Sequence, residues 1–280
     1  PCLNKPKYSQ KMFNFPKIPR EPGFQFKTNL LKSVTFQFGY PQNESIVKDE
    51  KYLREQLEEE FPNIKTLVKG EFTFGVSEKT QLFQQSKSST AGSEFRTQND
   101  YKVVSFTGDS LIITILGEAY SNYNQMFQEI EANFFPLFDK FGIDSFNRLA
   151  IRKINLTSFD IKEGSLPSQV LPIVFNKSLI DNIMFLPCHN FISTGITTST
   201  FRNDNYQLNL GYGLLNKTLK TEHDQIVLDI DLFKTEEMTA IKDVPIVMDN
   251  INAEIFNIFN WVIQKSFLQS LGSTENIANG

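Results

Sequence analysis

Two spacings of apolar residues alternate along this chain, and their order predicts its secondary structure. Apolar residues fill every second position over 31–40 and again over 204–215, as in strands that bury one face. Spacings of three and four residues mark a helix over 49–61 and a longer helix from about residue 122. The pattern therefore predicts strands and amphipathic helices together in one chain.

The first half of the pattern covers residues 28–142. Its helix at 49–61 is followed by several strand-like stretches, which are separated by turn-rich pieces such as 88–93. These predicted strands lie near 66–76, 80–87, 94–106 and 110–117. A long helix closes this half, and Pro136 is expected to kink it.

The second half, residues 143–272, follows a similar order. It opens with a predicted strand at 146–158, and two prolines then favour a broken helix over 166–181. Three more strands are predicted near 190–201, 204–215 and 224–233. A single helix, from about 249 to 271, closes this half as well.

Both halves read as β-α-β-β-β(β)-α units, which predicts an α+β protein with an internal pseudo-repeat. Consecutive strands joined by short turns pair antiparallel, and long helices then cover one face of each sheet. The order is similar to TATA-binding-protein-like and helix-grip folds, and a single continuous α+β domain is the alternative. The predicted organisation is an extended N-terminal arm at 1–27, halves at 28–142 and 143–272, and a C-terminal tail at 273–280.

Several segments together resemble a known protein family. They are LLKSVTFQF, which starts at residue 30, then AYSNYNQMFQEI, RLAIRKINLTSF, IVLDIDLF and the final INAEIFNIFNWVIQKSF. In this order they resemble an uncharacterised, sporadically distributed bacterial family over about residues 15–272. The resemblance implies a bacterial cytoplasmic protein of unassigned function, and it transfers no catalytic residue.

Charge and cysteine content narrow the classes of partner. With a net charge of −4 and a pI near 5.4, the 280-residue chain has no global field that favours nucleic acid. Two cysteines do not indicate a disulfide framework, and no apolar run is long enough to cross a membrane. We therefore expect a cytoplasmic protein without a membrane partner. The 27 Phe residues indicate either a Phe-rich core or an apolar ligand cavity.

Arg148 and Arg152 are the candidate residues for binding an anion or nucleic acid. They lie four positions apart on a predicted strand, so both side chains point to one face and can clamp a phosphate or carboxylate. The alternative is that each pairs with an acid on a neighbouring element. Asp229 and Asp231 also share a strand face. Their carboxylates either lie on the solvated side of a sheet, or they serve acid–base catalysis or bind a cation.

No catalytic or metal-binding motif is recognisable, so we expect no enzyme, no cofactor and no metal site. Cys188 beside His189, and His223 farther on, do not have the ligand spacing that structural zinc requires. Gly211 and Gly213 lie in a predicted strand rather than at a strand-to-helix turn, so they do not match a dinucleotide-binding loop.

The closing helix carries the candidate interface residues, Trp261 and Leu268. Trp261 lies near the centre of a polar arc that also holds Glu254 and Asn257, and Leu268 lies beside it. An apolar residue on a solvated arc is typical of a surface that contacts a partner. Docking against the other half of the chain is the alternative, and both stay open at this point.

These observations favour a non-enzymatic interaction or regulatory protein that forms a homo-oligomer or binds a protein partner. One alternative is a protein that binds nucleic acid or nucleotides on a sheet face, using Arg148, Arg152, Tyr206 and Tyr212. Another is an apolar small-molecule carrier, which the phenylalanine content favours.

Overall fold

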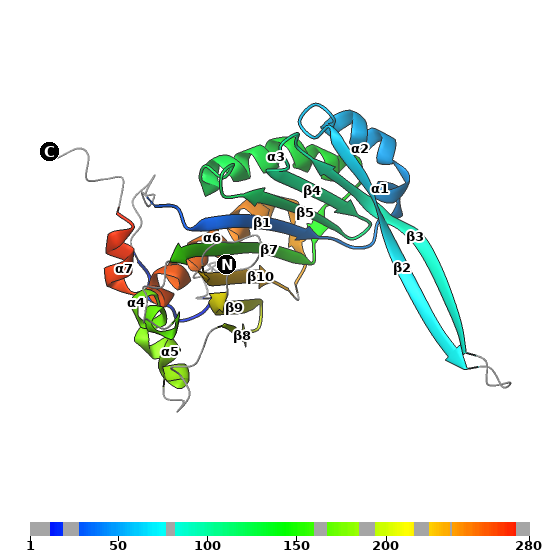
Figure 1. Ribbon diagram of the computed structural model, residues 1–280. Coiled ribbons are helices and arrows are strands. Elements are labelled where there is room, and N and C mark those ends of the chain that lie inside the picture. The colour runs from blue at the N-terminus through cyan, green and yellow to red at the C-terminus, as the bar shows by residue number, and fades with distance from the viewer. Residues whose placement is uncertain are drawn as a thin grey trace, which may run out of the picture. The chain divides into compact units, whose positions relative to one another are not determined.

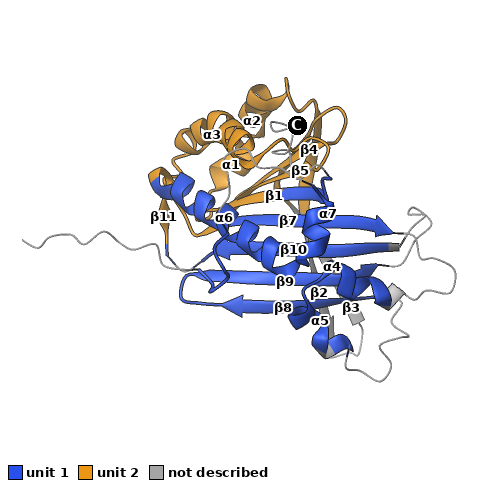
Figure 2. Ribbon diagram, turned by 90° about the vertical axis from the view of Figure 1, so that its left-hand side faces the viewer, with its two compact units in different colours: residues 1–34, 150–237, 243–280 blue, residues 35–149, 238–242 orange. Residues whose placement is uncertain are grey.

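The computed structural model describes residues 12–18, 28–76, 82–159, 167–184, 194–215, 224–235 and 237–272. These residues form a mixed α+β structure with an extensive antiparallel sheet and several helices (Figure 1), which confirms the predicted fold class. The chain divides into two compact units (Figure 2). Unit 1 contains Pro1–Val34, Ala150–Glu237 and Asp243–Gly280, and unit 2 contains Thr35–Leu149 and Met238–Lys242. The predicted boundary at residues 142 and 143 stays a prediction.

Two strands contribute residues to both units. They are β1 (Leu31–Gly39) and β7 (Arg148–Phe159). Within unit 1 the amide of Leu156 donates to the carbonyl of Leu30 (2.8 Å). Within unit 2 the amide of Asn147 donates to the carbonyl of Gly39 (2.9 Å). Because the partner's number falls as the residue number rises, β1 and β7 are antiparallel.

Unit 2 adds a meander of strands to its part of β1, in the order β2-β3-β4-β5-β1. The strands are β2 (Asn63–Val76), β3 (Leu82–Arg96), β4 (Lys102–Thr107) and β5 (Ser110–Leu116), and a short β6 (Ser145–Phe146) pairs with β11 (Thr239–Ala240). The helices are α1 (Glu44–Lys48), α2 (Glu50–Leu57) and α3 (Tyr123–Lys140). The two helices predicted for this part of the chain are confirmed.

Helix α3 begins where the sequence supplies a cap. The side chain of Asn122 accepts a hydrogen bond from the amide of Gln125 (2.9 Å), which satisfies one free donor of the first turn. The apolar stripe of α3 packs on the sheet of unit 2, where the ring of Phe138 lies 5.9 Å from that of Phe38 and 5.0 Å from that of Phe146. The helix continues through Pro136.

The third strand of unit 2 differs from its prediction. The sequence predicts a turn at 88–93, but β3 runs through it, because β2 on one side and, from Gly92 onward, β4 on the other pair with its backbone. The predicted strand at 94–106 is instead interrupted after Arg96, where Asp100 takes a positive φ of 58° in a turn. Pairing with neighbouring strands therefore overrides the turn-forming residues at 88–93, but not those between β3 and β4.

Unit 1 has the strand order β1-β7-β10-β9-β8. Its other strands are β8 (Gly195–Arg202), β9 (Tyr206–Leu215) and β10 (Asp224–Lys234). Its helices are η1 (Pro167–Val170), α4 (Leu171–Val174), α5 (Lys177–Met184), α6 (Val244–Val262) and α7 (Lys265–Ser270), and a 3₁₀ turn, η3 (Ile241–Asp243), precedes α6. The predicted broken helix and the three strands that follow it are confirmed. Helix α6 lies across one face of this sheet (Figures 1 and 2).

The single closing helix predicted at 249–271 is wrong. Helix α6 ends at Val262, Ile263 forms an antiparallel bridge with Phe175, and α7 then begins. The amide of Asn176 donates to the carbonyl of Val262 (2.7 Å), which has no partner within α6. No Gly or Pro marks this break in the sequence, so a partner distant along the chain decides it.

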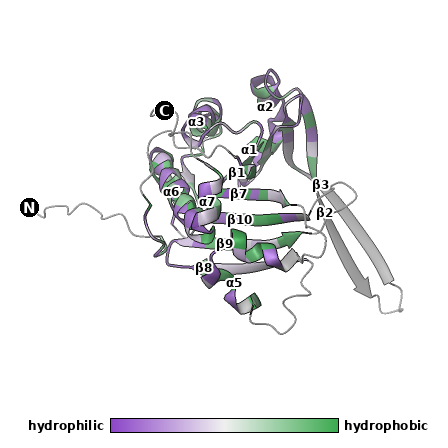
Figure 3. Cartoon of the chain, turned by 60° about the vertical axis from the view of Figure 1, so that its left-hand side comes forward, coloured by the Kyte–Doolittle hydropathy of each residue, from purple (hydrophilic) through white to green (hydrophobic). Residues whose placement is uncertain are grey.

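Hydropathy along the described residues fits a phenylalanine-rich core. Most of the largest side chains that are fully buried are phenylalanines: Phe36, Phe38, Phe95, Phe106, Phe138, Phe146 and Phe175. Helix α6 carries both apolar and polar residues along its length (Figure 3). No helix in the described part of the chain is both long enough and apolar enough to cross a membrane.

Candidate interaction site on helix α6

Helix α6 is buried on two sides. Its apolar stripe toward the sheet of unit 1 is almost fully buried: Met248, Ile251, Ile255, Ile258 and Val262. The side that carries Glu254 and Asn257 is covered too, because these residues are only 8% and 7% exposed. The sequence predicts these two side chains on a solvated arc, and that prediction is wrong. A carboxylate and an amide buried to this degree need hydrogen-bond partners.

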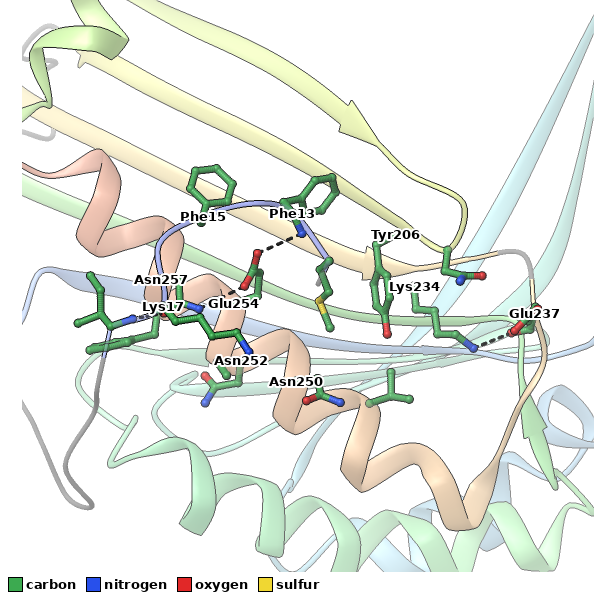
Figure 4. Close-up of a pocket in the computed structure, with 16 residues that line it drawn as sticks. Phe13, Phe15, Lys17, Tyr206, Lys234, Glu237, Asn250, Asn252, Glu254 and Asn257 are labelled. Atoms are coloured by element: carbon green, nitrogen blue, oxygen red, sulfur yellow. Dashed lines mark hydrogen bonds between the residues drawn. The ribbon is translucent and has the colours of Figure 1, made fainter. Parts of the chain in front are cut away.

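An N-terminal segment, residues 12–18, covers this side of α6. The backbone amide of Phe13 donates to Oε1 of Glu254 (3.2 Å), and the amide of Ile18 donates to Oδ1 of Asn257 (3.1 Å) (Figure 4). Nδ2 of Asn257 donates to Oε2 of Glu254 (3.2 Å), so both carboxylate oxygens have a donor. The segment contains no helix or strand, as predicted for the arm, and main-chain donors attach it to α6.

Side chains of the segment add further contacts. The ring of Phe15 meets that of Trp261 edge to face, with centroids 5.4 Å apart and planes 70° apart. Met12 is buried, and its carbonyl accepts a hydrogen bond from Nδ2 of Asn203. Asn14, Pro16 and Lys17 are exposed. One side of the segment therefore contacts the rest of unit 1, and the other side is exposed to solvent.

The break between α6 and α7 separates the two candidate interface residues. Trp261 is half-buried on α6, against Phe15, whereas Leu268 is half-buried on α7. The apolar residue on the polar arc thus contacts a segment of its own chain, which neither of the two sequence interpretations foresees. An interface with another molecule at these residues stays a prediction.

A pocket of about 560 Å³ lies between the segment, α6, the start of β9 and the end of β10 (Figure 4). Three polar side chains of α6 in its wall are at most 8% exposed: Asn252, Glu254 and Asn257. Lys17 from the segment and Lys234 from β10 also line it. Tyr206 also lines the pocket, and burial raises the pKa of its hydroxyl above the ordinary value.

Arg148 and Arg152 each have a partner within the protein. In unit 2, Nε of Arg148 donates to Oε1 of Gln37 (2.9 Å). In unit 1, two nitrogens of Arg152 donate to the two carboxylate oxygens of Asp229 (2.9 and 2.6 Å), and this pairing raises the pKa of Arg152. Pairing with a neighbouring acid is the alternative that the sequence leaves open. Anion binding by these arginines stays a prediction, and at Arg152 it requires release of Asp229.

The structure does not bring the aromatic residues of the nucleic-acid hypothesis to Arg152. Gly211 of β9 pairs with Asp229, and Tyr212 is the next residue. Consecutive strand residues point to opposite faces, so Tyr212 lies on the face opposite the Arg152–Asp229 pair, where its hydroxyl donates to a carbonyl of α5 (3.0 Å). Tyr206 lines the pocket at α6 instead.

The remaining candidate groups do not assemble into a site in the described residues. Asp231 accepts a hydrogen bond from Nδ2 of Asn209 (3.0 Å), so the two strand aspartates bind different protein groups. Across the described ranges, no group of three or more Cys, His, Asp or Glu side chains is placed to hold a metal ion. Cys188, His189 and His223 lie outside the described residues.

No family model matches this chain, and no curated protein matches it. The resemblance to a bacterial family therefore stays an expectation from sequence segments. Sequence reasoning missed the roles of Glu254, Asn257 and segment 12–18. The one signal for them was Trp261, an aromatic residue on an arc of polar residues.

Proposed function

We propose that this chain is an interaction protein rather than an enzyme, and that it self-associates by docking residues 12–18 of one copy on α6 of another. A single observation carries the proposal: a segment without regular structure covers α6 and binds Glu254 and Asn257, which are both buried. The segment supplies a main-chain donor to each of these side chains, and buried acceptors are costly to leave without donors.

The contacts combine general and specific recognition of an extended segment. Glu254 and Asn257 accept from main-chain amides, which every residue except proline offers. A hydrogen bond to a charged group contributes roughly 1.5–3 kcal/mol. The edge-to-face contact of Phe15 and Trp261 adds about 0.5–1.5 kcal/mol beyond the free energy gained by burying their surfaces. This contact selects an aromatic residue at the position of Phe15.

A second copy of the chain offers the same segment. Exchange of an identical segment between two copies is a low-cost route to a dimer, because each contact is kept. Residues 19–27 connect the segment to Thr28, and an extended connection of this length spans roughly 30 Å. Protein concentration then sets whether the segment on α6 belongs to the same copy or to another.

Two full-length variants with complementary defects test this proposal. Phe15→Ala damages the segment and leaves α6 intact, whereas Trp261→Ala damages α6 and leaves the segment intact. We expect the wild-type protein to dimerise with rising concentration in multi-angle light scattering. Each variant alone is expected to dimerise about as tightly, because the closed monomer and the exchanged dimer lose the same aromatic contact. An equimolar mixture restores one intact aromatic contact per pair, so it dimerises more tightly than either variant.

The matched control is Phe201→Ala, which removes an exposed aromatic residue of β8 outside the site. Its equimolar mixture with Trp261→Ala is expected to dimerise no more tightly than Trp261→Ala alone, because no intact aromatic contact is gained. A mixture of Phe15→Ala and Trp261→Ala that likewise shows no gain would assign self-association to another surface. A wild-type protein that stays monomeric at every concentration would contradict self-association itself.

We also propose that the two halves, residues 28–142 and 143–272, share one β-α-β-β-β(β)-α pattern, in the manner of TATA-binding-protein-like or helix-grip folds. The support is connectivity: the last strand of the first meander, β5, neighbours β1, and the last strand of the second, β10, neighbours β7. A long helix follows each meander. Superposition of the two halves in an experimental structure, with these strands matched, is the test. The bacterial cytoplasmic setting implied by the resemblance belongs to the same proposal.

A further inference from the structure

The pocket between segment 12–18 and α6 has the size and lining of a small-molecule site. Its volume of about 560 Å³ is within the range of roughly 300–1,000 Å³ that is common for such sites. Its lining combines apolar side chains with hydrogen-bond donors: Met12, Val247 and Phe256 with Lys17, Asn250 and Asn252.

Lys153 fixes the orientation of the Asn252 amide. Nζ of Lys153, on β7, donates to Oδ1 of Asn252 (2.7 Å), and Asn252 is only 6% exposed. An ammonium group only donates, so the carbonyl oxygen faces Lys153 and the amide nitrogen faces away from it. Nδ2 of Asn252 is therefore left to donate on the side that lines the pocket.

Two lysines and two acids are among the described residues that line the pocket: Lys17 and Lys234, and Glu237 and Glu254. Both oxygens of Glu254 accept hydrogen bonds from within unit 1. Nζ of Lys17 has no hydrogen-bond partner among the described residues. Nζ of Lys234 is held beside the pocket by the carbonyl of Glu237 (3.3 Å). Nζ of Lys17 and Nδ2 of Asn252 thus remain as donors for a ligand, and a carboxylate can accept from both.

We propose that this pocket binds a small organic carboxylate, whose oxygens accept from Nζ of Lys17 and Nδ2 of Asn252 and whose apolar part contacts Val247 and Phe256. Lys17 belongs to the segment and Asn252 to α6. A ligand that joins them strengthens docking of the segment on α6, whether the segment belongs to the same copy or to another. Binding in the pocket does not depend on the proposed function.

Isothermal titration of the full-length protein with hexanoate and with inorganic phosphate tests the site. Hexanoate is expected to bind more tightly than phosphate, because it adds an apolar part. Lys17→Met, which removes the ammonium, and Asn252→Asp, which keeps the acceptor for Lys153 but replaces the donor with a negative charge, each weaken hexanoate binding by about tenfold or more. The matched control is Lys265→Met, at an exposed lysine of α7 outside the pocket, and it binds like the wild type.

Several outcomes would overturn the site. They are no hexanoate binding at millimolar concentrations, unchanged binding in both pocket variants, or phosphate binding that equals or exceeds that of hexanoate. Light scattering with and without hexanoate separates this proposal from the proposed function. Binding without any dimer removes self-association and keeps the pocket, whereas a dimer without binding keeps self-association and removes the pocket. Binding that does not slow trypsin cleavage after Lys17 removes the effect on docking.

Discussion

The two long helices, α3 and α6, have nearly the same length and different surroundings. Helix α3 has 18 residues and α6 has 19, and each buries an apolar stripe on the sheet of its own unit. The other side of α3 is exposed, for example at Gln128 and Asn133. In α6, Ala253 is the one exposed position after Asn250. The helices thus differ in what covers the side away from the sheet.

This difference teaches that polar residues on a helix have two structural uses. On α3 they meet solvent, which is the usual consequence of an amphipathic pattern. On α6, Glu254 and Asn257 instead satisfy main-chain donors of segment 12–18. Polar residues in both uses recur with the same helical periodicity in the sequence. Only their contacts in the folded structure distinguish one use from the other. Substitutions matched between the helices can break or sharpen this comparison.

The largest expected effects test what the two helices share, their buried stripes. Phe138→Ala on α3 is expected to cost about 3–5 kcal/mol of unfolding free energy, and Ile258→Ala on α6 about 2–5 kcal/mol, because each leaves a cavity in a packed core. Both side chains are fully buried. Urea unfolding followed by circular dichroism measures the losses. A loss below about 1 kcal/mol at either position would show that the stripe packs loosely there.

A smaller effect tests the difference, with the same substitution on each helix. Asn257→Ala on α6 is expected to cost about 1–3 kcal/mol, because it removes the acceptor of the Ile18 amide and one donor to Glu254. Asn133→Ala on α3 is expected to change stability by less than about 0.5 kcal/mol, because this side chain is exposed.

Urea unfolding and limited trypsin digestion provide two measures of this pair. Asn257→Ala should speed cleavage after Lys17, because the segment detaches more often, whereas Asn133→Ala should leave the cleavage rate unchanged. Equal stability losses in the two variants, with no change in cleavage, would mean that the segment does not depend on α6.

Much of the fold can be predicted from local pattern, because a strand with one buried face must alternate. The predictions at 204–215 and 224–233 correspond to β9 and β10 for this reason. The boundaries that could not be predicted depend on distant partners. Strand β3 continues through 88–93 because β2 and β4 pair with it, and α6 ends at Val262 beside Phe175.

The candidate site could be predicted only in outline. The sequence identifies Trp261 as unusual, and it identifies the arm as extended. It cannot join them, because the two hydrogen bonds link residues 241 and 239 positions apart. No helical or strand period reports contacts at such separations. Glu254 and Asn257 therefore look like solvated residues until the segment that covers them is known.

The smallest expected effect compares how the two helices begin. Asn122→Ala is expected to cost about 1 kcal/mol, because its side chain caps α3 through the amide of Gln125. Asp243 occupies the same position before α6 but makes no side-chain capping bond, so Asp243→Ala removes only a carboxylate near the helix N-terminus and costs a few tenths of a kcal/mol. Urea unfolding measures both, and Asn122→Asp, which keeps an acceptor, serves as the control.

Equal losses at the two caps would mean that Asp243 caps α6 in solution. An Asn122→Ala loss that exceeds the Asp243→Ala loss would instead mean that α6 has less local support at its start than α3. Helix α6 then depends more on tertiary contacts, which are the sheet on one side and segment 12–18 on the other. Under that dependence, detaching the segment weakens α6 itself, and the stability of this helix reports whether its outer side is occupied.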